Sequence, residues 1–314
     1  MQLRALKPSC VAQALFVAML AFSSTPGAQS PPPVPLVREN VTEKISDHVY
    51  VIPDASVPLV PNIGFVVGSK ATLVIDTGMG RRNGDAVMRE LAKVSKNSQW
   101  YVATTHFHPE HSMGTSFPAG TTFVYPKAQQ QDFDEFGAGM VDTFSKRSPA
   151  IADLLQDAKY PRAAQPFDRD QKLDLGGVHI TLTWLGPTHT RGDTAIFVEE
   201  DRILFAGDLA MKGAFPAFAS PYSSGKTWLA SLDKLDAMRP VKVVGSHGEM
   251  GDASLISEYR NYLRAVQSRV AQLKSSGVSV TDASKTLTAE FEAKYPNWSA
   301  PARIAGAVQA FYNE

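Results

Sequence analysis

Three histidines and one glutamate fall within six consecutive residues, and this cluster constrains the chain more than any other feature of its sequence. The letters THFHPEH follow a short strand predicted at 100–104. On an extended segment the side chains of His106 and His108 project to the same side, because alternate residues share a face. Glu110 and His111 follow after a turn set by the proline. With only seven histidines in 314 residues, this grouping predicts a metal site at the exit of a strand, where a rigid sheet can aim the donors.

The donors available to such a site are imidazole nitrogens and carboxylate oxygens. The chain has a single cysteine, Cys10, which lies near the N-terminus, so neither a disulfide framework nor a cysteine-rich zinc site is possible. Nitrogen and oxygen donors without sulfur suit zinc, iron, manganese or nickel, and zinc is the usual choice for hydrolysis. We therefore expect zinc.

Three later segments each place a ligand-type residue beside a glycine at the end of a predicted strand. These residues are His189, Asp208 and His247. A neighbouring glycine lets the backbone approach a site closely. Each residue alone could be a capping or turn residue, but together with the first cluster they indicate one common site. The remaining histidines, His48 and His179, lie within strand patterns without companion donors, and we interpret them as structural.

The periodicity along the chain predicts two blocks of strands, each followed by helices. Two such blocks suggest an α/β fold in which two sheets are covered by helices, an αββα sandwich, although periodicity alone is compatible with other α/β folds. The predicted strands lie at 44–53, 62–68, 71–76, 100–104, 178–185, 194–199, 202–207 and 241–245. The predicted helices lie at 85–94, 227–238 and 255–273, with helices and loops at 127–170 and one or two short helices between 281 and 311.

The first 28 residues have the layout of a secretory signal peptide. A basic start with Arg4 and Lys7 precedes an apolar run at 11–22, and small and turn-forming residues follow. The apolar run is too short to span a bilayer comfortably; the alternative is a buried N-terminal helix. Cleavage near Ala28 predicts a periplasmic or secreted protein without a stable membrane anchor.

The remaining chain is predicted to contain a linker and one domain. Residues 29–42 are rich in proline and are predicted to be an extended linker. Residues 43–314 then form a single domain that ends in a helical tail. The 31 basic and 31 acidic residues give a formal net charge of zero. Because no basic excess is present to bind a phosphate backbone, we expect no nucleic-acid partner.

Taken together, these motifs resemble those of the metallo-β-lactamase superfamily of metallohydrolases. The resemblance covers about residues 43–273 and implies an αββα four-layer sandwich with an active site between the two sheets. It also implies a hydrolase that acts on a small-molecule substrate. The matching stretches, in the order of the family, are 73–78, 106–111, 186–190, 203–208 and 243–247.

The resemblance also implies a ligand set for one to two zinc ions per chain. By motif position, His106, His108 and His189 hold the first ion, Glu110, His111 and His247 hold the second, and Asp208 bridges them or completes the second site. Asp76 matches an aspartate that supports the site from beneath. Glu110 makes the motif HxHxEH where the family usually has HxHxDH. Its carboxylate either binds the second metal with altered geometry or is displaced and acts as a base.

The predicted chemistry is attack of a metal-bound hydroxide on a carbonyl, with Glu110 or Asp208 orienting the nucleophile and relaying a proton. A β-lactam-like amide is slightly favoured as substrate, because the stretch 243–255 resembles that of the lactamase subclass with a cysteine ligand. However, Asp208 stands where that subclass has its cysteine, and Lys212 lies near but not at the position of its substrate-binding lysine.

Two alternatives remain open at this point. An aspartate at position 208 is typical of lactonases and of glyoxalase II-like thioesterases, which would use the same site. A non-hydrolytic di-iron or metal-binding protein is the other alternative. If position 208 does not set the substrate class, we expect pocket loops at 56–62 and 127–170 to do so.

Overall fold

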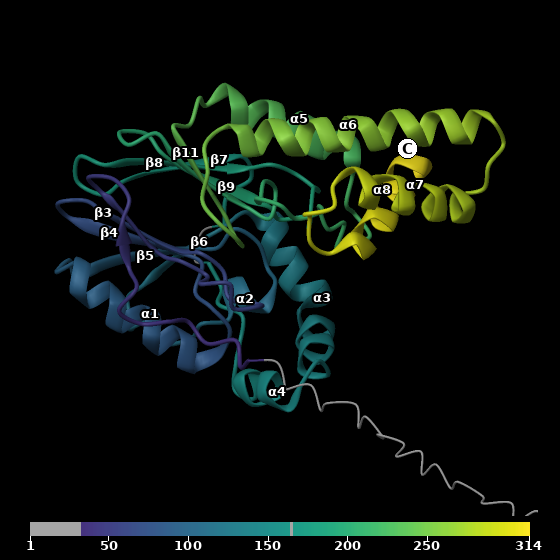
Figure 1. The fold of residues 1–314 in the computed structure, drawn as a ribbon. Helices are drawn as coiled ribbons and strands as arrows, with labels where there is room; N and C mark the ends of the chain where they lie inside the picture. Colours follow the sequence, from purple (N-terminus) through teal and green to yellow (C-terminus); the bar gives the residue numbers. More distant parts are fainter. Residues whose placement is uncertain (1–32, 164–165) are drawn as a thin grey trace, which may run out of the picture. The chain divides into compact units, whose positions relative to one another are not determined.

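The computed structural model describes residues 33–163 and 166–314 (Figure 1). The predicted signal peptide lies outside the described residues. Within the described ranges, no helix is both long enough and apolar enough to cross a membrane. The described part of the predicted linker lies against helix α1 (Gly80–Val94): the backbone N–H of Val37 donates to Asn83 Oδ1 at 2.8 Å, and Asn83 Nδ2 donates to the carbonyl of Pro35.

Two mixed sheets make the centre of the fold. In the first sheet, β1 to β4 are antiparallel neighbours and β5 and β6 are added in parallel. In the second sheet only the pair β10–β11 is parallel. The first sheet has the order β1 (Glu43–Lys44), β2 (Val49–Ile52), β3 (Ile63–Val67), β4 (Ala71–Ile75), β5 (Gln99–Ala103), β6 (Thr122–Val124). The second has the order β11 (Lys242–Gly245), β10 (Ile203–Gly207), β9 (Thr194–Val198), β8 (His179–Trp184), β7 (Asp170–Asp174).

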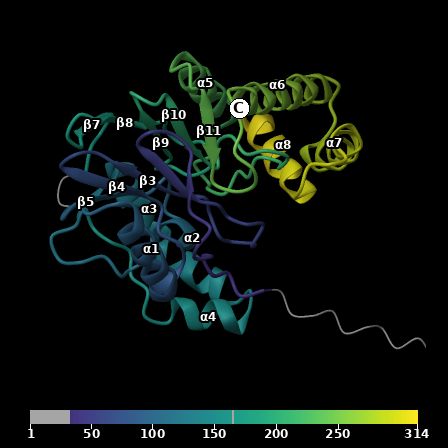
Figure 2. The same cartoon turned by 60° about the vertical axis from the view of Figure 1, so that its left-hand side comes forward.

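The central strands are apolar at nearly every position because both of their faces are covered. In β4, Leu73 and Ile75 pack into the layer between the two sheets, whereas Val74 packs against Val87 and Leu91 of α1. This alternation follows from the period of two along a strand. Figures 1 and 2 show the resulting four layers, with α1 outside the first sheet and α5 and α6 outside the second. The predicted αββα sandwich is therefore confirmed.

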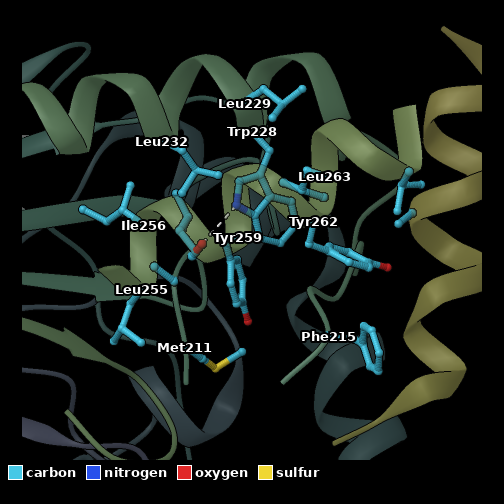
Figure 3. Packing of buried hydrophobic residues seen from close by; sticks show 14 of the residues in the cluster. Met211, Phe215, Trp228, Leu229, Leu232, Leu255, Ile256, Tyr259, Tyr262 and Leu263 are labelled. Atoms are coloured by element: carbon cyan, nitrogen blue, oxygen red, sulfur yellow. Dashed lines mark hydrogen bonds between the residues drawn. The ribbon is translucent and has the colours of Figure 1, made fainter. Parts of the chain in front are cut away.

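Helices α5 (Gly225–Ala237) and α6 (Ser254–Ser275) cover the second sheet around a fully buried tryptophan. Figure 3 shows Trp228 among Leu232, Tyr259 and Leu263. Its indole N–H donates to the carbonyl of Leu209 at 3.2 Å, which satisfies the one polar atom of this side chain.

The helical tail belongs to the same core. Helices α7 (Val280–Lys294) and α8 (Ile304–Asn313) pack on α6, and Phe291 and Val308 join the cluster around Trp228. A short 3-10 turn, η1 (Pro301–Arg303), connects them.

Some predicted boundaries were wrong, and each error has a local cause. Helix α1 begins at Gly80 rather than at residue 85, because its first turn, GRRNG, shows little apolar periodicity. Gly80 has a φ of 74°, and a Cβ there would lie 2.0 Å from the carbonyl oxygen of Leu154 in α4 (Pro149–Leu155). The strand predicted at 44–53 is divided into β1 and β2 by a turn. The short β6 and the polar edge strand β7 were not predicted.

Candidate metal centre

The structure brings all seven predicted ligand residues together at one edge of the two sheets. Four of them leave the first sheet, at the end of β5 and in the short helix α2 (Pro109–Ser112), and three leave the second sheet, after β8, β10 and β11. Their donor atoms form three overlapping groups, in each of which all atoms lie within 4.8 Å of one another. The groups are His106, His108 and His189; His106, His111 and Asp208; and Glu110, His111 and His247.

The first group consists of three converging imidazoles. Nδ1 of His108 lies 3.0 Å from Nε2 of His106 and 3.2 Å from Nε2 of His189. Burial lowers the pKa of His106 and of His108 well below the usual value, and the neighbouring imidazoles add to this effect. The rings are therefore neutral, which is the form in which an imidazole binds a metal.

The group of Glu110, His111 and His247 lies on the other side of Asp208 from the first group. Oδ1 of Asp208 is 4.0 Å from Nε2 of His111 and 4.0 Å from Nε2 of His247, while its Oδ2 is 3.5 Å from Nε2 of His189. The Asp208 carboxylate thus stands between the two groups. Burial opposes its ionisation, but the imidazoles of His189 and His247 hold the pKa of Asp208 well below its usual range. Burial raises the pKa of Glu110.

Several donor atoms at this centre are buried without a hydrogen-bond partner among the described residues. They include Glu110 Oε2, His111 Nε2 and Asp208 Oδ1. Unpaired buried polar atoms are rare because each loses its hydration without compensation. Here each atom belongs to a residue of the three converging groups, and a divalent cation would satisfy them together. The residues present therefore fit the metal ions that the sequence predicts.

Each of four histidines has its second ring nitrogen held by a neighbouring group, which fixes the ring so that Nε2 faces the centre. Partners of this kind orient metal ligands and raise their basicity. The pairs are His106 Nδ1 with Thr105 Oγ1 (3.1 Å), His111 Nδ1 with Asp76 Oδ2 (2.9 Å), His189 Nδ1 with the carbonyl of Ala217 (2.6 Å), and His247 Nδ1 with the carbonyl of Val60 (3.0 Å).

Asp76 supports the centre from the side that faces away from the converging donors. It follows β4 with a φ of 60° and accepts hydrogen bonds from the backbone N–H of Thr105 at 2.7 Å and from Thr105 Oγ1 at 3.0 Å. Burial opposes the charge of His111, but the Asp76 carboxylate outweighs it and raises the pKa of His111 to about 9.

A cavity of about 920 Å³ opens over the centre and gives a substrate access to it. Its lining includes the 56–59 loop and the end of α3 (Lys127–Ser145), so parts of both predicted pocket segments, 56–62 and 127–170, contribute walls. Lys212, which the sequence placed near a substrate-binding position, pairs instead with Glu249 and is not a lining residue.

Sequence reasoning missed some residues around the centre. The buried carboxylate of Asp193 accepts hydrogen bonds from Thr188 Oγ1 and from the N–H and Oγ1 of Thr190, and so fixes the loop that carries His189. Asp193 lies only four residues after His189, and this proximity in the sequence could have indicated that its carboxylate supports the site. The other two histidines have structural partners as expected: His48 pairs with Asp201, and His179 pairs with Glu200. Two arginines in the cavity wall, considered below, had no sequence signal.

With the geometry established, comparison with known proteins identifies the family. A model of the metallo-beta-lactamase superfamily matches residues 57–247, more than half of the chain. The chain belongs to the metallo-beta-lactamase superfamily. This confirms the predicted family, and with it a hydrolase whose family typically binds metal ions.

Three individual proteins are similar to this chain in sequence or in fold. Human acyl-coenzyme A thioesterase MBLAC2 is 25% identical over 188 residues, which are 55% of this chain and 66% of that protein. The metallo-beta-lactamase from Pontibacter korlensis is 18% identical with a TM-score of 0.56, over 71% of this chain and 98% of that one. The sec-alkylsulfatase Pisa1 from Pseudomonas sp. is 12% identical with a TM-score of 0.65, over 87% and 49%. The two solved structures show the shared fold.

Proposed function

We propose that the protein is a secreted zinc hydrolase that cleaves thioester or ester bonds at this centre. The observation that carries the proposal is the position of Asp208, whose two carboxylate oxygens face different ligand groups beneath a large pocket. The name of the human relative, an acyl-coenzyme A thioesterase, supports the same substrate class.

The residues of the centre provide the parts that carbonyl hydrolysis needs. A divalent cation held by these residues would make a bound water acidic and polarise the carbonyl of the substrate. The carboxylates of Glu110 and Asp208, whose Oε2 and Oδ1 have no hydrogen-bond partner among the described residues, would hold the cation and orient the attacking water. Apolar side chains such as Leu59, Met140 and Phe144 line the pocket and exclude bulk water from the reacting carbonyl.

The leaving group decides between the substrate classes. Asp208, whose carboxylate oxygens face both ligand groups, would help to hold two cations, and these would supply an acidic but weakly nucleophilic water. Thioesters and activated esters tolerate this because their leaving groups depart without a proton. An amide nitrogen needs a proton or a metal before it leaves. The position of Asp208 therefore favours thioesters and esters, including lactones.

β-Lactam hydrolysis is the second candidate function. It is favoured by the stretch 243–255, which resembles the corresponding stretch of a lactamase subclass. Asp208 takes the place of the cysteine of that subclass, so we expect β-lactam turnover to be slower than ester or thioester turnover.

The test compares kcat/KM for nitrocefin, a homoserine lactone and an acyl thioester on the zinc-loaded enzyme, with metal content measured for each variant. Asp208→Ala should lose the second metal and activity on every substrate. Asp208→Cys should raise the ratio of β-lactam to lactone hydrolysis. An unchanged ratio with both metals bound would show that position 208 does not set the substrate class. Absence of hydrolysis of all three substrates would contradict the proposed function.

The proposed secretion has a separate test. The layout of residues 1–28 supports export, and a metal centre without thiolate ligands suits an oxidising compartment. N-terminal sequencing of protein recovered from the periplasm or medium should begin near Gln29. Mature protein found in the cytoplasm with Met1 intact would contradict export.

A further inference from the structure

We propose that Arg147 and Arg303 form an anion-binding position in the wall of the pocket. Resting on the proposed function, this position narrows the substrate class to acyl compounds that carry a negatively charged group apart from the reacting carbonyl. Both arginines line the same cavity as His108, Glu110 and His189.

Arg303 reaches the pocket from the helical tail. It ends η1, is half-buried, and donates one hydrogen bond, from Nη1 to the carbonyl of Phe215 at 3.3 Å. A guanidinium has five N–H donors, so most of them are left for another partner.

The segment before Arg303 is fixed to the pocket wall by backbone hydrogen bonds. The N–H of Ser299 donates to the carbonyl of Gly213 at 2.8 Å, and the N–H of Phe215 donates to the carbonyl of Ser299 at 3.1 Å. Arg303 lies beyond residues 57–247, the part that matches the superfamily. The helical tail therefore contributes to the pocket a positively charged side chain, Arg303, that lies outside the part of the chain matched by the family.

Arg147 reaches the pocket just after α3. Its guanidinium carbon lies 3.8 Å from the centre of the Phe144 ring, and this stacking holds the planar group beside the cavity. The two arginines thus come from separate elements, and both line the cavity over the centre.

Neither arginine is neutralised by a carboxylate in the part of the chain that the structure describes, unlike other basic residues near the pocket. Arg191 pairs with Asp132 and Glu135, and Lys212 pairs with Glu249. Basic side chains left without a counter-ion in a cavity favour an anionic ligand, because an arginine fork binds carboxylate, sulfate and phosphate groups with charge-assisted hydrogen bonds.

Besides Glu110 and Asp208, a third acid lines the pocket, and both of its carboxylate oxygens accept hydrogen bonds from the backbone. Asp54 accepts hydrogen bonds from the backbone N–H groups of Ser56 at 3.0 Å and Gly248 at 2.7 Å. Much of the wall between the charged groups is apolar, although it also contains Ser56, Thr143 and Ser299. The substrate that fits this pocket has an apolar acyl part and a distal anion. The apolar wall residues include Val57, Leu59, Met140, Phe144 and Met211.

The experiment uses two esters that differ only at the far end of the acyl chain. 4-Nitrophenyl octanoate ends in a methyl group, and mono-4-nitrophenyl suberate ends in a carboxylate. The zinc-loaded enzyme should prefer the suberate in kcat/KM. Arg303→Gln and Arg147→Gln should each reduce this preference by about tenfold, through a higher KM for the suberate. Arg303→Lys should keep part of the preference, and Lys212→Gln serves as the surface control.

The outcomes separate the inference from the proposed function. If the enzyme cleaves both esters without preferring the suberate, the inference is overturned but the proposed hydrolase activity stands. The same conclusion follows if the Arg147→Gln/Arg303→Gln double variant keeps the preference for the suberate. If neither ester is cleaved, binding of free suberate is measured by calorimetry on the zinc-loaded proteins. Weaker binding to the double variant than to Lys212→Gln then supports the anion position, and equal binding overturns it.

Discussion

At the scale of single residues, Glu110 is where the chain departs from the usual motif of its family. Its side chain is one methylene longer than aspartate, is buried in α2, and has Oε2 without a hydrogen-bond partner among the described residues. It belongs to the group with His111 and His247. This geometry favours a ligand of the second metal rather than a displaced base.

The Glu110 side chain can be tested by two substitutions. Glu110→Gln removes the charge while keeping the size, so metal analysis should show loss of about one of two zinc ions, with the first site still filled. Glu110→Asp restores the usual motif, and activity should be kept or raised. If Glu110→Asp abolishes activity while both metals stay bound, the longer side chain is needed for chemistry and the ligand assignment is wrong.

Asp76 offers a second test at this scale. Asparagine tolerates the positive φ of residue 76. In the Asp76→Asn variant, however, the side chain presents an N–H₂ group to Nδ1 of His111, so the ring proton moves to Nε2, the nitrogen that faces the metal site. We expect metal affinity to fall about 10- to 100-fold, measured by competition with a chelator of known affinity. The control is Asp153→Asn, which removes an exposed pair with Arg82. Equal affinities in the two variants would contradict the role of Asp76.

At the scale of elements, the sequence predicted the buried strands and long helices well, because their apolar periodicity is strong. It also predicted all seven residues that converge, since each follows a strand end beside a recognisable motif. It could not predict groups that reach the centre through tertiary packing. The carbonyl of Val60 has no residue signature, and Arg147 and Arg303 acquire their positions from the packing of α3 and the helical tail.

The packing of the helical tail can be tested by its effect on the stability of the protein. Phe291 of α7 is fully buried against Tyr262 of α6. Phe291→Ala should lower the free energy of unfolding by about 3–5 kcal/mol, because it removes apolar contacts and leaves a cavity. The measurement is urea-induced unfolding of the zinc-loaded protein. Glu292→Ala, at the exposed neighbouring position, should leave stability unchanged, and a similar loss in both variants would show that the tail does not depend on this packing.

At the scale of the whole domain, the metal centre joins the two sheets. His106, His108 and His111 leave the first sheet, whereas His189 and Asp208 leave the second. Ions bound between them connect two layers that otherwise contact each other mainly through apolar side chains. Metal binding should therefore stabilise the folded domain as well as activate it, because the unfolded chain does not hold these donors together.

Removal of the metal tests this coupling. A ligand present at about 100 times its dissociation constant stabilises the folded state by about 2.7 kcal/mol, so a strong chelator should lower Tm by about 5–10 °C in a domain of this size. Activity should be lost in parallel and return when zinc is added. His108→Ala removes a ligand that both neighbouring imidazoles face, so this variant should lack activity and show little further change with chelator. A chelator effect on Tm as large in His108→Ala as in the wild type would mean that the stabilising ions bind elsewhere.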